Sequence, residues 1–272
     1  MRISISNIAW RADEERAVRE LLAARGVDAV EVAPSKIGPK PAELQAEELR
    51  RYREFWSERG IEIVAMQALL FGRGDLALFG SDEQREELFD YLARIVRLGG
   101  ALGARALVFG SPGNRKRGEL SLEQAAELAA PFFRRIGDVA VESGTCLCIE
   151  PNPPEYGCDW IQRASQAREF VEQVAHPGFG LHLDAGALHM TGEDVDQIVA
   201  SAGRIRHFHA SQPQLAPVGP GTSVPHERYA QSLRSSGGVR VVSIEMRQVE
   251  ASESNLAHVE RALDYVQSVY GE

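Results

Sequence analysis

Acidic or imidazole side chains end four short apolar runs in the second half of the chain. The runs are Cys-Leu-Cys-Ile-Glu150, Leu-His-Leu-Asp184, Arg-His-Phe-His209 and Val-Ser-Ile-Glu245. Three carboxylates that point at one spot repel one another and resist ionisation unless a cation neutralises them. Oxygen-rich ligation with one imidazole suits Mn²⁺, Mg²⁺ or Co²⁺ at least as well as Zn²⁺. These residues therefore predict a site for one divalent metal ion, with Mn²⁺ as the preferred candidate.

The four runs belong to a series of eight apolar, β-branched segments, most of which are followed by a helical stretch. The segments cover residues 3–9, 29–33, 61–68, 104–109, 146–149, 180–183, 205–208 and 239–244. Strands that alternate with helices imply βαβ crossovers and a parallel sheet. An open doubly wound sheet favours a glycine-rich phosphate loop after its first strand. Here the first strand runs into Ser6-Asn7-Ile8-Ala9-Trp10, so we predict a single (β/α)8 TIM barrel domain over residues 1–272.

The active site of a TIM barrel lies at the carboxyl ends of the strands. All four candidate ligands fall there, one on each of four consecutive strands, and their convergence is the strongest functional signal in the sequence. His182 and His207 each lie two residues before a candidate ligand and one layer deeper. We expect these two imidazoles to be hydrogen-bonded core groups, or groups that support the ligands from behind, rather than ligands.

Helix-capping residues mark several of the segments between the strands. Asp13 is expected to cap the first helix, and Ser81 to open a later helix with two acidic residues in its first turn. Ser121 and Gln124 have the capping-box spacing before an apolar-periodic stretch. Ser252 precedes the last helical pattern.

Charge and cysteine content narrow the class of protein. The chain has 272 residues and a formal net charge of −9, which argues against a polynucleotide partner because nucleic-acid binding uses a basic face. It contains neither a run of about 18 apolar residues nor a secretory leader. The three cysteines, Cys146, Cys148 and Cys158, fit a reducing compartment better than a disulfide framework. We therefore expect a cytoplasmic protein that uses neither nucleic acid nor a membrane.

The motifs Glu150-Pro-Asn, Leu-Asp184, His209-Ala-Ser and Ile-Glu245 carry a family resemblance. Together they resemble the sugar phosphate isomerase/epimerase superfamily of xylose isomerase-like TIM barrels, in particular the D-tagatose 3-epimerase-type ketose epimerases, over essentially the whole chain. The resemblance implies a bound metal that polarises a substrate carbonyl and an adjacent hydroxyl. One glutamate then removes the proton between them and the other returns it on the opposite face of an enediolate; Glu150 and Glu245 hold those positions.

The same resemblance implies a small carbohydrate-like substrate, namely a sugar, sugar acid, cyclitol or derivative, and allows a homodimer or homotetramer. The candidate substrate-binding residues are Asn7, Gln67, Asn114, Arg115, Asn152, Gln212 and Arg247. The loop that carries Asn114 and Arg115 should overhang the site, where it could hold a phosphate or carboxylate. Arg247 lies two residues past Glu245 on the same strand face, which makes it a candidate anion or hydroxyl clamp.

The chain also departs from the epimerase pattern. The family often has a histidine where Ala187 stands, and a glutamate and an arginine where Gln212 and Leu215 stand. These changes keep open a superfamily lyase, either a dehydratase or a C-glycoside-cleaving type, that would use the same metal and a carboxylate base. They also keep open a non-catalytic barrel that has lost the sugar clamp. An endonuclease IV-like nuclease is a further alternative, but it would need more histidines and a basic groove.

Overall fold

A computed structural model describes residues 1–201, 205–250 and 254–271 of the chain. Its parallel strands close into a barrel in chain order, and β8 pairs with β1 to complete the ring. The strands are β1 (Arg2–Ser6), β2 (Ala29–Val32), β3 (Glu62–Met66), β4 (Ala106–Phe109), β5 (Leu147–Ile149), β6 (Phe179–Asp184), β7 (Ile205–Ser211) and β8 (Val241–Glu245). The predicted TIM barrel is confirmed.

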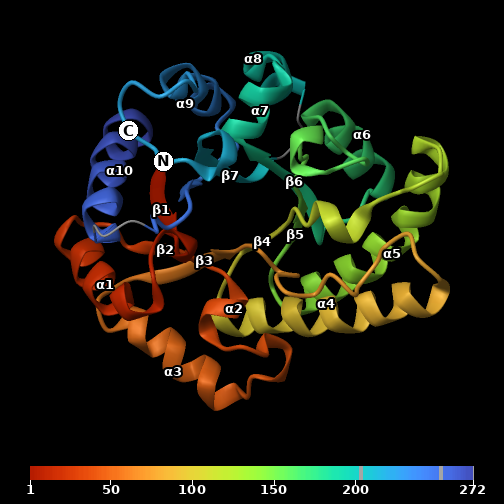
Figure 1. Ribbon diagram of the computed structural model, residues 1–272, viewed down its shortest axis with the longest axis horizontal. Helices are drawn as coiled ribbons and strands as arrows, with labels where there is room; N and C mark the ends of the chain where they lie inside the picture. The colour runs from red at the N-terminus through yellow and green to blue at the C-terminus, as the bar shows by residue number, and fades with distance from the viewer. Residues whose placement is uncertain (202–204, 251–253, 272) are drawn as a thin grey trace.

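The helices form an outer ring around the strands (Figure 1). They are α1 (Glu15–Ala24), α2 (Pro34–Ile37), α3 (Ala46–Ser57), α4 (Asp82–Leu102), α5 (Leu122–Glu142), α6 (Ala164–Val174), α7 (Ala185–Thr191), α8 (Val195–Ser201), α9 (His226–Ser236) and α10 (Asn255–Tyr270). The start of the chain lies beside the end of α10, where the Met1 amino group donates to the Tyr270 carbonyl oxygen at 3.1 Å. No helix in the described ranges is both long enough and apolar enough to span a bilayer.

The capping residues read from the sequence are partly confirmed. Ser81 and Ser121 cap α4 and α5, each accepting from the backbone N–H three residues on. Asp13 does not cap α1, because it lies inside a 3-10 turn and Glu14 occupies the cap position. Ser252 falls outside the described residues.

Two strand boundaries differ from the sequence prediction in ways that matter for the site. The first strand stops at Ser6 because the chain turns into a 3-10 helix over Asn7–Ala9. The seventh strand runs on to Ser211, since β6 and β8 provide pairing partners on both sides. The extra length of β7 carries its polar end to the mouth of the barrel.

The core lies in the layer between the strands and the helix ring, where apolar side chains from both are buried. The interior of the barrel is different, because buried polar side chains point into it. Its most enclosed members are Ser4, Glu31, His182, His209 and Ser243, each with 0% relative exposure. Buried polar groups need partners, and these groups lie directly beneath the strand ends that carry the candidate ligands.

Candidate metal centre and its cavity

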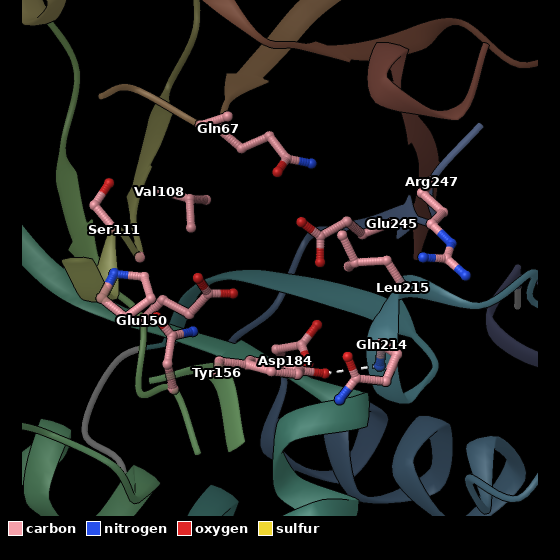
Figure 2. A pocket seen from close by; sticks show the side chains of 14 residues that line it. Gln67, Val108, Ser111, Glu150, Tyr156, Asp184, Gln214, Leu215, Glu245 and Arg247 are labelled. Atoms are coloured by element: carbon pink, nitrogen blue, oxygen red, sulfur yellow. Dashed lines mark hydrogen bonds between the residues drawn. The ribbon is translucent and has the colours of Figure 1, made fainter. Parts of the chain in front are cut away.

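The four predicted ligands converge at the carboxyl ends of their strands. Asp184 lies opposite His209 in the β6–β7 pair, and Ser211 lies opposite Glu245 in the β7–β8 pair. Glu150 follows directly after β5. Donor atoms from Glu150, Asp184, His209 and Glu245 all lie within 4.8 Å of one another. Figure 2 shows the carboxylates of Glu150 and Glu245 entering the cavity from opposite sides, with Asp184 between and below them.

The imidazole of His209 has one engaged and one open nitrogen. Nε2 lies 3.0 Å from Oε2 of the buried Glu31 carboxylate, so that nitrogen carries the proton. Nδ1 has no hydrogen-bond partner among the described residues, although it is buried. It faces Glu245 Oε2 at 3.2 Å, Glu150 Oε1 at 3.9 Å and Asp184 Oδ2 at 4.0 Å. Nδ1 therefore points into the cluster of carboxylates.

These separations fit a divalent cation. Ligands bound at about 2.0–2.2 Å from one ion lie about 3 to 4.4 Å from one another, which is the range seen around His209 Nδ1. The chemistry of the set, three carboxylates and one neutral imidazole nitrogen, is that of a hard or borderline divalent ion. The residues present thus fit one metal ion at this position.

The charges in the cluster lead to the same conclusion. Burial, followed by the neighbouring Glu245 and Glu150 carboxylates, raises the pKa of Asp184 to about 7. Burial also raises the pKa values of Glu150 and Glu245. Burial alone would lower the pKa of His209, but the Glu31 and Glu245 carboxylates raise it well above its ordinary value. Without a cation, the cluster therefore holds protons that a bound metal ion would displace.

The Asp184 carboxylate is oriented by groups around it. Its Oδ1 accepts from the Ala187 backbone N–H at 2.7 Å, and its Oδ2 accepts from the Ser211 hydroxyl. The Ser211 oxygen in turn accepts from the Gly186 backbone N–H at 2.9 Å. Ala187 thus holds a candidate ligand in place through its backbone, and it brings no imidazole to the cavity.

Glu31, His207 and His182 form a buried polar group beneath the cluster. Glu31 Oε1 lies 3.3 Å from His207 Nε2, and the imidazoles of His209 and His207 outweigh the effect of burial and hold the Glu31 pKa well below its ordinary value. Neither ring nitrogen of His182 has a hydrogen-bond partner in the described ranges; its ring packs 4.2 Å from the His209 ring and its Nε2 lies 3.5 Å from Glu150 Oε1. Among the described residues His182 is therefore not a hydrogen-bonded core group, and it lies behind two of the candidate ligands, as the other expectation has it.

The sequence offers Glu31 as a polar residue near the end of the second strand, but it gives this residue no partner. The available signal was an acidic residue inside the four-residue apolar strand β2, where both neighbours are valines. A buried carboxylate in that position requires a partner, but only the closed barrel shows that the partner is His209.

A cavity of about 440 Å³ opens above the four ligands, which is within the usual range for small-molecule sites. Its lining combines the three carboxylates with amide, hydroxyl and apolar side chains. The lining residues are Gln67, Ala68, Val108, Gly110, Ser111, Pro112, Glu150, Asn152, Tyr156, Asp184, Gln214, Leu215, Glu245 and Arg247. Figure 2 places Glu150 and Glu245 across the cavity from each other, with Leu215 and Arg247 on the Glu245 side.

Three of the predicted substrate-binding residues line this cavity: Gln67, Asn152 and Arg247. Gln67 Nε2 donates to the Ser6 hydroxyl at 2.7 Å, which leaves its amide oxygen free for a ligand. Asn152 Oδ1 accepts from Arg115 at 3.1 Å, and the Asn152 side chain is also hydrogen-bonded to the Glu150 carboxylate. Their roles in substrate binding stay predictions, but their positions allow them.

The other four predicted residues lie in the cavity wall rather than at its surface. Asn7 accepts from the Ala33 backbone N–H at 2.8 Å, and Asn114 donates to the Arg73 and Leu76 carbonyl oxygens at 2.7 and 2.8 Å. Both amides therefore tie loops together at the mouth of the barrel.

Arg115 and Gln212 are likewise engaged inside the protein. Arg115 has 0% relative exposure and donates to the carbonyl oxygens of Gly110 at 2.6 Å and Glu150 at 2.7 Å. Gln212 Nε2 contacts Nε2 of the buried His226 at 2.8 Å. Arg115 therefore fixes the backbone that carries Glu150, and the structure brings neither side chain to the cavity.

Strained backbone gathers around the cavity. Ala68, Ser111, Gln214 and Leu215 line it and have positive φ angles, from 40° to 61°, although none is a glycine. Such conformations cost free energy and persist where the surroundings enforce them, most often at functional sites. The Tyr156 hydroxyl helps to enforce one of them, because it accepts from the Gln214 backbone N–H at 2.9 Å.

Comparison with known families identifies the class of protein. Residues 19–268 match the family described as a xylose isomerase-like TIM barrel. The chain belongs to that family, as the resemblance in the sequence predicted.

Solved structures show the same fold. A D-psicose 3-epimerase crystallised in the presence of D-fructose has a TM-score of 0.81 and 17% identity, covering 100% of both chains. The IOLI protein with a bound zinc atom has a TM-score of 0.78 and 18% identity, covering 100% of this chain and 98% of that one. At these identities the likeness concerns the fold.

One curated protein matches a part of the chain. The ATP-dependent zinc metalloprotease FtsH of Endomicrobium trichonymphae is 34% identical over 107 residues, which cover 32% of this chain. The chain spans 17% of the length of that relative. A match of this extent carries no argument about the barrel or its site.

Proposed function

We propose that this chain is a divalent-metal-dependent isomerase or epimerase of a small carbohydrate. The observation that carries the proposal is the open, buried Nδ1 of His209, which faces the Glu150, Asp184 and Glu245 carboxylates while Glu31 holds its Nε2. The cavity above these residues has the volume of a small-molecule site. The solved epimerase of the same fold, crystallised with D-fructose, is consistent with a sugar as substrate.

In the proposed reaction, Glu150 and Glu245 move one proton. Their carboxylates enter the cavity from opposite sides (Figure 2), so a carbon between them is accessible on both faces. The ion, when bound, would polarise the carbonyl next to that carbon and stabilise negative charge on its oxygen. One glutamate takes the proton from the carbon, giving an enediolate, and the other returns a proton to the opposite face. Return to the same carbon inverts its configuration, whereas return to the former carbonyl carbon isomerises the sugar.

The surroundings of the two glutamates fix the position of Glu150 and raise the pKa of both carboxyl groups. Arg115 holds the backbone of Glu150 through its carbonyl oxygen at 2.7 Å. Burial raises the pKa of each glutamate, and a carboxylate with a raised pKa is a better base. We extend the proposal to one barrel domain over residues 1–272, Mn²⁺ as the resident ion, a cytoplasmic location, and a homodimer or homotetramer.

Metal analysis is the first test. The purified chain should bind one equivalent of Mn²⁺, Mg²⁺, Co²⁺ or Zn²⁺, and His209→Ala should remove binding because it deletes the imidazole donor. His189→Ala is the matched control, since His189 is exposed and lies outside the cluster. A chain that binds none of these ions would be a non-catalytic barrel.

Solvent-deuterium exchange is the second test. The metal-loaded protein in D₂O should place deuterium on the carbon between the carbonyl and the adjacent hydroxyl of a ketose or sugar acid, as read by NMR.

Two side chains of the expected sugar clamp are missing from the cavity, and their loss favours the lyase alternative. Ala187 stands where a histidine was expected, and Gln212 turns toward His226. A lyase would release water or cleave the sugar from its aglycone, and would show this as a product of lower mass. Failure of every tested ketose and sugar acid to exchange a proton would exclude the epimerase reading for them.

A further inference from the structure

Arg247 provides the one Lys or Arg side chain that lines the cavity within the described ranges. It follows the last ligand, Glu245, by two residues, and it is exposed at the mouth. No ion pair or hydrogen bond engages its guanidinium among the residues that the structure describes. A cation that lines a cavity and has no protein partner is available to a ligand.

The arginines on neighbouring loops at the same end of the barrel are engaged. Arg73 forms an ion pair with Asp75 at 2.6 Å, and Arg117 donates to the Asp159 carbonyl oxygen at 2.9 Å. Arg247 therefore differs from the arginines around it in having no group of the protein to neutralise or orient it.

The backbone that carries Arg247 is fixed. Its N–H donates to the Leu215 carbonyl oxygen at 2.9 Å, and the next N–H, of Gln248, donates to the Ile8 carbonyl oxygen at 3.0 Å. The segment after β8 is thus held from both sides, by the loops that follow β7 and β1. The side chain of Arg247 therefore extends from a fixed backbone. It lies beside Leu215, on the Glu245 side of the cavity (Figure 2).

The spacing sets which part of a substrate Arg247 can reach. Arg247 lies two residues beyond the end of β8, and Figure 2 shows its guanidinium on the Glu245 side of the cavity, away from Glu150. A group bound by the guanidinium therefore lies well away from the carbon between Glu150 and Glu245, at the other end of a sugar-sized carbon chain. The wall beside it is apolar at Leu215 (Figure 2), and no second Lys or Arg side chain lines the cavity within the described ranges.

We propose that the substrate carries a terminal anionic group, a carboxylate or a phosphate, and that Arg247 binds it. The guanidinium presents two parallel N–H donors that match either group. This inference rests on the proposed function, because it takes the carbon between the two glutamates as the reacting end. Arg247 is then the residue that selects acidic or phosphorylated sugars over neutral ones.

The test compares three sugars of one carbon skeleton that differ only at carbon six: D-fructose, D-fructuronate and D-fructose 6-phosphate. Their binding to the Mn²⁺-loaded full chain is measured by calorimetry, and deuterium exchange is followed in parallel. At least one anionic sugar should bind ten-fold or more tighter than D-fructose, the effect expected for a charge-assisted hydrogen bond. The better of the two anions identifies a carboxylate or a phosphate as the natural group.

Arg247→Gln should reduce the preference to within about two-fold of D-fructose, while Arg240→Gln should leave it unchanged. Arg240 is an exposed arginine at the opposite end of the same strand, β8, and is the matched control. Equal binding of all three sugars, no binding of either anion, or a preference that survives Arg247→Gln would overturn the inference. An anion preference that depends on Arg247, without deuterium exchange in any of the sugars, would contradict the proton-transfer function. Deuterium exchange in D-fructose at the same rate in the wild type and in Arg247→Gln, without a preference for the anions, would support the proton-transfer function and contradict the role of Arg247.

Discussion

Glu31 of β2 and His209 of β7 meet inside the barrel, 178 positions apart in the sequence, with His209 Nε2 3.0 Å from Glu31 Oε2. The carboxylate holds the proton on Nε2 and turns the lone pair of Nδ1 toward the candidate ligands. A histidine that binds a metal commonly donates its other N–H to a carboxylate, which fixes its tautomer and strengthens it as a ligand. Glu31 thus orients a candidate metal ligand through its other ring nitrogen.

Replacing Glu31 should weaken metal binding. In Glu31→Gln the carboxylate charge is lost and the Nε2 proton is no longer favoured, so the Kd for Mn²⁺ should rise about 10- to 100-fold. Calorimetry measures the affinity, and ¹⁵N NMR of the imidazoles reports the His209 tautomer. Glu15→Gln is the matched control, because Glu15 is a partly buried carboxylate that accepts from Tyr52 at 2.7 Å away from the site. An unchanged Kd together with an unchanged tautomer would contradict the role of Glu31.

The two glutamates should affect turnover more than binding. In Glu150→Gln and Glu245→Gln, measured at saturating Mn²⁺, deuterium exchange should fall about 10²- to 10⁴-fold, the usual contribution of a general acid or base. Substrate affinity should change far less. Glu155→Gln is the control, an exposed acidic residue in the loop after β5 that does not line the cavity. Near-normal exchange in both cavity variants would remove the two-glutamate mechanism.

The Asp184 carboxyl should make the metal-free protein less stable as the pH rises from about 4 to about 7. The pKa of Asp184 is raised from 3.8 to about 7 in the folded state, so between these values the folded chain binds more protons than the unfolded chain. The free energy of unfolding then falls with rising pH and levels off above about 7. Urea unfolding of protein stripped of metal measures this slope, and Asp184→Asn should reduce it. A slope in the wild type that equals the slope of the variant would refute the assignment.

Mn²⁺ binding should show the opposite dependence. The ion competes with the proton on Asp184, whose pKa is about 7, and with the proton on His209, whose pKa is raised well above its ordinary value. The affinity should therefore rise with pH, and the part of the rise that is due to Asp184 should end above about pH 7. Calorimetry in two buffers of different ionisation enthalpy would count the protons released. Binding at pH 6 without proton release would show that Asp184 is already ionised in the metal-free chain.

The barrel and the convergence of its four strand ends could be predicted from the sequence, because a polar side chain that ends an apolar barrel strand points toward the active-site end of the barrel. The orientation of side chains after a strand could not. Asn7 was expected to face the cavity, but the 3-10 turn over Asn7–Ala9 places its amide against the Ala33 backbone N–H. Gln212 similarly turns to the buried His226. The orientation of such a side chain depends on a few backbone angles and on hydrogen-bond partners that lie far away in the sequence.

The same limit explains why Arg115 was expected to hold a phosphate or carboxylate of the substrate above the site. A basic residue in a Gly-Asn-Arg-Lys-Arg loop is usually exposed, and burial of a guanidinium is costly unless its donors are satisfied. Here backbone carbonyl oxygens, including those of Gly110, Glu150 and Trp160, take up its donors. Those carbonyl groups belong to several loops, and the sequence gives no sign that they surround one arginine.

Gly110 offers a change that should disturb the metal centre while sparing the fold. A Cβ at this position would lie 2.2 Å from Oε2 of Glu150, whereas a Cβ at Gly113, in the same loop, would have no atom within 4 Å. The end of the Glu150 side chain can rotate away at little cost, so Gly110→Ala should unfold at nearly the wild-type temperature. The displaced carboxylate should nevertheless raise the Kd for Mn²⁺ at least tenfold, because one ligand is removed from the set. Calorimetry and thermal unfolding of both variants separate the two effects: Gly113→Ala should match the wild type in each, and wild-type affinity in Gly110→Ala would show that Glu150 does not hold the ion in this orientation.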